Sequence, residues 1–197
     1  MNRTLAVVAA LLSVAVLAGC SSNEDLADQY REGSAKGYIS GDFRVVEIPP
    51  ADRGAPVVFE GVTETAERVS SDDYRGRILV VNFWYAACGP CIVEAPMLEE
   101  VWEEYQGQQV DFLGVNTYDQ PATALSFARD NNVTYPSVID VTDGKVKLAF
   151  AQVTPIQATP TTLVLDREGR VAARIIGQLA SASILSTLVK DALEEPS

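Results

Sequence analysis

The chain has 197 residues, of which 47% are hydrophobic, so it can form a globular domain with a sizeable core. It carries 27 acidic against 15 basic side chains, and this net charge of -12 argues against nucleic acid as a partner. It has no histidine, which excludes histidine-based catalytic triads, C-x-x-C-H haem attachment and most zinc sites. Its three cysteines are too few for a disulfide-dense scaffold.

The first twenty residues have the pattern of an export signal. Arg3 precedes an apolar or small run over residues 5–18, which is shorter than the about 20 residues needed to span a membrane. The run ends in Leu-Ala-Gly-Cys at residues 17–20, which resembles the lipobox of bacterial lipoproteins. That resemblance implies cleavage before Cys20 and attachment of a lipid to its sulfur; the alternative is a plain secretory signal.

Three segments follow from this interpretation. Residues 1–19 are expected to be a lipoprotein signal peptide, and residues 20–41, which are polar, a lipid-anchored flexible tether. Residues 42–197 are expected to form the folded domain. We therefore expect the protein on the extracytoplasmic face of a bacterial cell membrane, attached through Cys20.

Apolar runs with strand or helix periodicity alternate along the domain. This alternation, with a final hairpin and closing helix, predicts an α/β fold with a mixed central sheet flanked by helices. The expected strands cover residues 43–48, 57–62, 78–83, 110–116, 135–140, 161–165 and 170–176, and the expected helices cover residues 92–105, 121–131, 146–151 and 182–193.

Cys88 and Cys91 lie where an apolar strand is expected to turn into a helix. Two thiols separated by two residues at such a junction indicate a thioredoxin-like redox motif. The helix N-terminus favours the Cys88 thiolate, and Cys91 lies one turn further on the same face. Half of a zinc site would need further Cys or His ligands, and a structural disulfide over so short a loop would stabilise little. We therefore assign Cys88 as the attacking thiol and Cys91 as the resolving thiol.

Two further positions are ambiguous from the residues alone. Glu94 lies three residues after Cys91, where its carboxylate could exchange a proton with the resolving thiol or be an ordinary surface group. Thr159-Pro160 precedes an expected strand, where the proline could form a plain edge turn or a cis peptide bond.

The motif around the two cysteines resembles that of the thioredoxin superfamily. The shared pattern consists of Phe83-Trp84, Cys88-Gly89-Pro90-Cys91, Pro96 and Thr159-Pro160. Asn82 replaces the buried Asp of cytosolic thioredoxins, and Glu94 occupies the position of a functional acid in the TlpA/ResA-like branch. The resemblance to this branch implies a thioredoxin-like fold with an N-terminal β-hairpin, matched in outline by residues 43–69, and a central insertion, matched by residues 110–140.

The same resemblance implies roles for the site residues. Cys88 and Cys91 would form a redox-active disulfide, with Glu94 as the proton acceptor or donor. Substrate would be bound by Trp84, Gly89, Pro90, Thr159 and Pro160, the last of these in a cis-proline loop. The sequence departs from the family at Ala87, where a Trp is common, and this change would alter access to the Cys88 sulfur.

The expected function is thiol–disulfide exchange with protein substrates, with no metal and no cofactor. The branch implies reduction of apocytochrome c cysteines in cytochrome c maturation, with a membrane thiol reductase as the electron source. We expect the protein to be a monomer. One alternative is a peroxiredoxin-like peroxidase, which would need a Thr and an Arg near the reactive cysteine. Another is a lipoprotein that only binds a partner and whose cysteine pair is inert.

Overall fold

The computed structural model describes residues 44–196, in which six strands form one mixed sheet in the order β1-β8-β7-β4-β5-β6. Strands β4, β5 and β6 are parallel to one another, and β7, β8 and β1 continue the sheet antiparallel on the other side of β4. The strands are β1 (Val45–Glu47), β4 (Ile78–Trp84), β5 (Val110–Asn116), β6 (Ser137–Ile139), β7 (Thr161–Leu165) and β8 (Val171–Ile176). The expected signal peptide, Cys20 and the tether lie outside the described residues.

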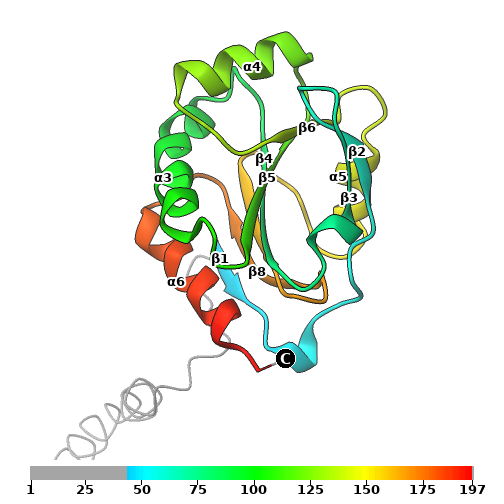
Figure 1. The fold of residues 1–197 in the computed structure, drawn as a ribbon, viewed down its shortest axis with the longest axis vertical. Helices are drawn as coiled ribbons and strands as arrows, with labels where there is room; N and C mark the ends of the chain where they lie inside the picture. Colours follow the sequence, from blue (N-terminus) through cyan, green and yellow to red (C-terminus); the bar gives the residue numbers. More distant parts are fainter. Residues whose placement is uncertain (1–43, 197) are drawn as a thin grey trace, which may run out of the picture. The chain divides into compact units, whose positions relative to one another are not determined.

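Helices cover both faces of this sheet, with α3 and α6 on one face and α5 on the other (Figure 1). Trp84, at the end of β4, is covered by α4, whose Phe127 ring lies 4.3 Å from the Trp84 ring between centroids. The helices are α3 (Gly89–Tyr105), α4 (Pro121–Asp130), α5 (Lys145–Ala151) and α6 (Ala182–Glu194). The mixed α/β fold predicted from the sequence is therefore confirmed. No helix among residues 44–196 is long and apolar enough to cross a bilayer.

Strand β4 is buried along its whole length and supplies side chains to both faces of the sheet. Because side chains alternate along a strand, Leu79, Val81 and Phe83 pack toward α5, and the intervening residues point toward α3 and α6. Asn82 belongs to this second set, so the only polar side chain of the strand points toward α3. This orientation places an amide beside the helix that carries both cysteines.

The N-terminal hairpin differs in detail from the outline expected between residues 43 and 69. It is formed by β2 (Glu60–Val62) and β3 (Arg68–Ser70), followed by the 3₁₀ turn η2 (Ser71–Tyr74). Strand β1 is not part of it: β1 pairs with β8 at the edge of the main sheet. Strand β3 is not among the expected strands, because its three residues carry too short a pattern to be distinguished from the polar turn that follows.

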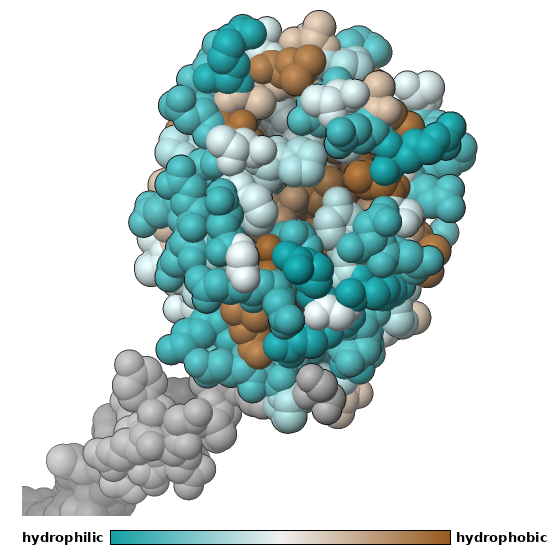
Figure 2. All heavy atoms as spheres, viewed as in Figure 1, coloured by the Kyte–Doolittle hydropathy of each residue, from teal (hydrophilic) through white to brown (hydrophobic). Residues whose placement is uncertain are grey.

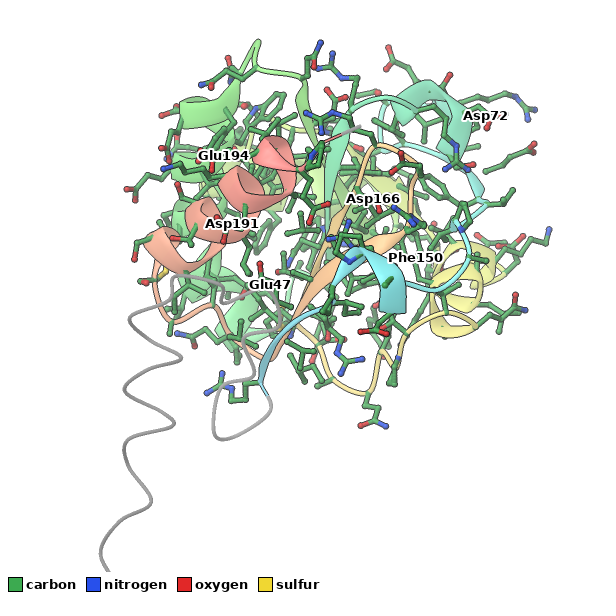
Figure 3. The ribbon with its side chains drawn as sticks, turned by 90° about the horizontal axis from the view of Figure 1, so that it is seen from below. Glu47, Asp72, Phe150, Asp166, Asp191 and Glu194 are labelled. Carbon is green, nitrogen blue, oxygen red and sulfur yellow. A yellow bond between two sulfur atoms is a disulfide. The ribbon has the colours of Figure 1, made fainter. Side chains whose placement is uncertain are left out.

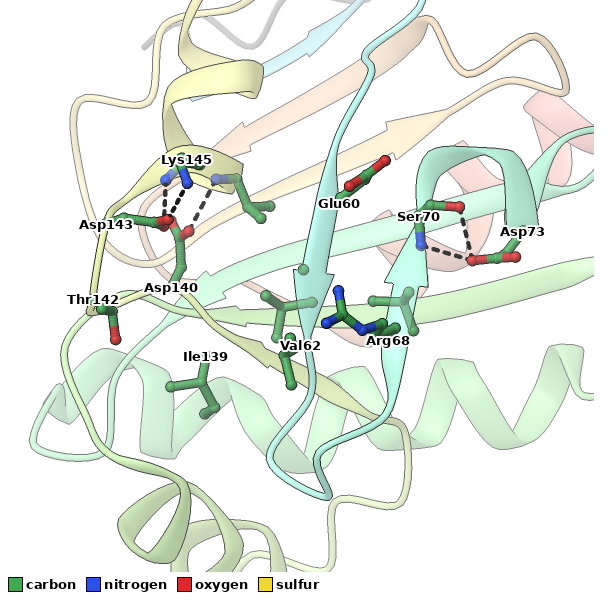
Figure 4. A pocket seen from close by; sticks show the side chains of 14 residues that line it. Glu60, Val62, Arg68, Ser70, Asp73, Ile139, Asp140, Thr142, Asp143 and Lys145 are labelled. Atoms are coloured by element: carbon green, nitrogen blue, oxygen red, sulfur yellow. Dashed lines mark hydrogen bonds and ion pairs between the residues drawn. The ribbon is translucent and has the colours of Figure 1, made fainter.

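A groove of about 690 Å³ opens between this hairpin and the β6–α5 region (Figure 4). Apolar side chains are visible in a hollow within the largely hydrophilic face shown in Figure 2. Several charged groups of the groove are engaged internally: Asp143 pairs with Lys145, and Asp140 accepts hydrogen bonds from two N–H groups at the start of α5. Asp73 caps η2 through the N–H of Ser70. The lining of the groove contains neither cysteine, and its three aspartates stabilise local structure.

The opposite end of the sheet from the cysteines is held by a buried ionic cluster. Arg53, which follows the 3₁₀ turn η1 (Pro50–Asp52), donates to the carboxylates of Asp166 and Glu195. Asp166 also accepts from Arg170, 2.8 Å away. In Figure 3, Asp166 lies between α6 and the N-terminal segment. The cluster links the segments near both ends of the described chain to the β7–β8 hairpin, and so it stabilises this end of the domain.

Candidate active site

Cys88 and Cys91 form a disulfide at the junction of β4 and α3, with their Cα atoms 5.2 Å apart. Cys88 occupies the N-cap of α3, and its sulfur accepts a hydrogen bond from the Cys91 N–H at 3.2 Å. Pro90 lies in the first turn, where its missing N–H removes no helical hydrogen bond. The backbone dipoles of α3 thus point their positive end at Cys88, which stabilises a thiolate there after reduction.

The two sulfurs have little contact with solvent, since Cys88 exposes 3% of its surface and Cys91 2%. The residues around them are open: Ala87, Gly89 and Pro90 are all exposed. Gly89 and Pro90 therefore lie where the sequence resemblance expects substrate contact. The small side chain of Ala87 leaves the surface in front of Cys88 without a large ring.

Glu94 is fully buried, with 0% of its surface exposed, one turn beyond Cys91 on the inner face of α3. One carboxylate oxygen accepts from Asn82 Nδ2 and the other from the Leu179 N–H, each at 2.8 Å. Burial raises the pKa of Glu94 to about 7, although both hydrogen bonds act to lower it. Glu94 is therefore a buried carboxyl group, unlike the exposed glutamates of α3, and it titrates near neutral pH.

A small cavity of about 10 Å³ is lined by Cys91 and by Asn82, the hydrogen-bond partner of Glu94. Tyr135 and Ser137 also line it, and the rest of the lining is apolar or aromatic. This volume is comparable to that needed for one water molecule. The amide that holds Glu94 and the sulfur of the expected resolving thiol thus share one internal space.

The loop before β7 faces the disulfide from the opposite side. The Thr159-Pro160 peptide bond is cis, and the Thr159 carbonyl oxygen lies 4.0 Å from the Cys88 sulfur. Pairing of Thr161 with Phe83 sets this position, because it brings the start of β7 beside the end of β4. The Gly177 N–H donates to the Pro160 carbonyl oxygen at 2.8 Å and holds the loop from β8. The structure thus brings Thr159 and Pro160 to the cysteine pair.

Trp84 is positioned differently from the substrate contact that we expected. The residue is 6% exposed, and its ring packs on Phe127 and donates from Nε1 to Ser137 Oγ at 3.1 Å. Trp84 therefore supports the start of the cysteine loop from inside the core. The expected strand ended at residue 83, whereas β4 extends through Trp84 and buries it.

A turn at residues 116–119 also touches the cysteine loop, and we did not identify it from the sequence. Asp119 Oδ2 accepts from the Ala86 N–H at 2.6 Å, and the Thr117 N–H donates to the Trp84 carbonyl oxygen at 3.1 Å. The Asn116-x-x-Asp119 spacing after a strand is the signal that could have found it, since Asn and Asp hydrogen-bond to nearby backbone in turns.

No cluster of three or more His, Cys, Asp or Glu side chains suited to a metal ion occurs among residues 44–196. The chemistry available at this site is that of the sulfur pair and the buried carboxylate. A mixed sheet with a CxxC disulfide at the N-terminus of a helix and a facing cis-proline defines a protein of the thioredoxin-like fold class.

Comparison with known proteins identifies the family within this class. Residues 53–174 match the model of the AhpC/TSA family, and the chain belongs to that family. It is 37% identical over 112 residues to the thiol-disulfide oxidoreductase ResA of Geobacillus thermodenitrificans, covering 57% of this chain and 62% of that protein. It is 29% identical over 118 residues to ResA of Bacillus subtilis, covering 60% of this chain and 63% of that protein. The chain therefore matches less than two-thirds of the length of these curated relatives.

A solved structure gives a more complete match. A DsbF homologue from Corynebacterium diphtheriae is 28% identical with a TM-score of 0.65, and the match covers 81% of this chain and 99% of that one. The similarity to ResA agrees with the branch that Asn82 and Glu94 indicated in the sequence.

Proposed function

We propose that this protein is a thiol–disulfide oxidoreductase that exchanges its Cys88–Cys91 pair with cysteines of protein substrates. The observation that carries the proposal is a disulfide placed at the start of a helix one turn from a fully buried carboxylate. The names of the ResA relatives support the same chemistry. The acidic groups of the groove beside the hairpin offer no comparable reactive pair.

In the reducing direction, the Cys88 thiolate attacks one sulfur of a substrate disulfide and releases the other as a thiolate. The Cys91 thiol then loses its proton, and its sulfur attacks Cys88 in the resulting mixed disulfide. This second step releases the remaining substrate thiolate and forms the intramolecular disulfide. Two electrons pass to the substrate, and the pair ends in the oxidised state that the structure contains.

Glu94 is suited to take the Cys91 proton during the second step. With a pKa of about 7, its carboxyl group exchanges protons at neutral pH, as an efficient general base requires. Asn82 holds the carboxylate and lines the same small cavity as Cys91, so the acid is held close to the resolving thiol. The cis-proline loop, 4.0 Å from Cys88, is suited to align the substrate backbone for the first step.

The finer assignment rests on the resemblance to the TlpA/ResA-like branch. We propose that the pair acts as a reductant, with apocytochrome c cysteines as the substrate and a membrane thiol reductase as the electron donor. The Gly89-Pro90 sequence between the cysteines resembles that of the reducing members and supports this direction. A monomer is the expected working form.

Reduction of insulin by the dithiol form, together with the potential of the pair, tests this function. We expect insulin disulfides to be reduced and the potential to lie near that of thioredoxin, about -270 mV, because a reductant must be easier to oxidise than its substrate. A potential near about -120 mV would instead make the protein an oxidant. Consumption of hydrogen peroxide without insulin reduction would favour a peroxidase, and no reaction with either would favour a binding protein.

We also propose attachment to the extracytoplasmic face of the cell membrane through lipidated Cys20. The motif at residues 17–20 after the apolar run supports this location. A Cys20→Ser change should abolish lipid attachment, because a cysteine sulfur is needed to receive the lipid. The variant should then be found in the soluble fraction or as the longer, uncleaved precursor. Fractionation with metabolic lipid labelling measures this, and unchanged labelling in the variant would contradict the proposal.

A further inference from the structure

Tyr118 is an aromatic side chain held in an exposed position next to the cysteine loop. It exposes 73% of its surface, whereas most large apolar side chains in the described domain are buried. Single exposed apolar residues are common on protein surfaces and need no explanation by themselves. Tyr118 differs from these residues in two ways: hydrogen bonds fix its backbone, and the residues that it contacts precede Cys88 in the chain.

The backbone around Tyr118 is fixed by side-chain hydrogen bonds. Asn116, which is fully buried, accepts from the N–H groups of Tyr118 and Asp119 at 3.1 and 2.7 Å. Its own amide group donates to Asp119 Oδ2 at 3.0 Å. A contact residue that is already ordered loses less conformational entropy when a partner binds. The turn therefore presents the Tyr118 ring at low entropic cost.

The same turn is attached to the segment in front of Cys88. Asp119 accepts from the Ala86 N–H, and the ring of Tyr118 lies 5.8 Å from that of Tyr85 between centroids. The Tyr85 carbonyl oxygen in turn accepts from the Cys88 N–H at 3.2 Å. Tyr118 is thus linked by direct contacts to the backbone that carries the attacking sulfur.

An exposed apolar surface adjoins the disulfide, although the whole chain has a net charge of -12. Ala87, Gly89 and Pro90 form its centre, and Ile92 and Val93 in the first turn of α3 are 45% and 52% exposed. Such a surface suits the apolar side chains of an unfolded polypeptide. Because residue 87 is alanine, no aromatic ring stands directly before Cys88 in the sequence.

We propose that Tyr118 is a substrate-contact residue that receives an apolar side chain of an unfolded polypeptide next to its reacting cysteine. The proposal rests on the thiol–disulfide exchange function and adds a specificity determinant to it. The aromatic ring that the motif lacks at residue 87 is supplied by the 116–119 turn. The protein then discriminates between protein disulfides and small disulfides, because a small disulfide reaches Cys88 without touching Tyr118.

The test compares a protein substrate with a small one. The full-length protein in detergent is reduced, and second-order rate constants are measured with insulin and with 2-hydroxyethyl disulfide. Tyr118→Ala should lower the insulin constant about three- to tenfold, the loss expected for one aromatic contact, and leave the small-disulfide constant unchanged. Tyr118→Phe, which keeps the ring, should react with insulin like the wild type.

Leu148→Ala is the matched control, since Leu148 is also exposed, at 58%, but lies on α5 on the other face of the sheet. It should leave both constants unchanged. Equal insulin constants for wild type and Tyr118→Ala would overturn the proposal, and so would an equal loss with both substrates, which would indicate altered Cys88 reactivity. Failure of the wild type to react with insulin would overturn the proposed function itself, and this inference with it.

Discussion

Replacing Cys91 with serine should stop turnover and leave Cys88 in a stable mixed disulfide with its substrate. Cys91 is the sulfur bonded to Cys88 in the structure, and it is 2% exposed. Without that sulfur no internal group can attack the mixed disulfide, while Cys88 keeps its position at the helix N-terminus and still reacts. Turnover of insulin should therefore fall to the uncatalysed rate.

Non-reducing gel electrophoresis with mass spectrometry measures the trapped species. All variants should carry Cys20→Ser, so that the third cysteine of the chain contributes no adduct. Cys88→Ser is the paired variant: it should lose turnover and trap nothing, because the remaining Cys91 lines the internal cavity and does not stand at the helix N-cap. Equal trapping by both variants, or turnover by Cys91→Ser, would contradict the assignment of attacking and resolving thiols.

Replacing Glu94 with glutamine should slow the resolving step about 100-fold at neutral pH, the lower end of what a general base contributes. In the wild type, the rate of this step should rise as pH increases through about 7, because the carboxylate that accepts the Cys91 proton forms in that range. The variant should lack this rise. Stopped-flow measurement of mixed-disulfide decay between pH 5 and 9 gives both profiles.

The same carboxyl group makes stability depend on pH. Its pKa is raised by burial from 4.5 to about 7, so between these values the folded protein holds a proton that the unfolded chain has lost. The stabilisation is complete below about pH 4.5 and is lost as pH rises through about 7. Glu94→Gln should remove this part of the pH dependence in denaturant unfolding of the oxidised protein.

Glu100→Gln provides the control for both measurements, because Glu100 is an exposed carboxylate on the same helix. It makes the same Glu-to-Gln exchange on α3 without altering a buried group. Its rate and stability profiles should follow those of the wild type. If Glu94→Gln also followed the wild type in decay rate, Glu94 would have no part in the proton transfer.

Much of the fold and the centre of the site could be predicted because their signals are local. The apolar run of β4 followed by a CxxC pair indicates a strand–helix junction, whatever the rest of the chain does. The alternation of strands and helices was enough for the α/β class. The pairing of short strands was harder to predict. β1 and β3 have only three residues each, and the partner of β1 is β8, far along the chain.

The sequence by itself therefore determined the chemistry: two cysteines with helical spacing, a carboxylate one turn later and no histidine to suggest another reaction. Only the tertiary structure decided the surroundings that set their reactivity. Burial against Asn82 and Leu179 makes Glu94 titrate near neutral pH, and the packing of Trp84 removes it from the surface. The turn at residues 116–119 meets the cysteine loop because β4 and β5 are parallel neighbours that end together, and contacts of this kind between distant segments leave no local pattern in the sequence.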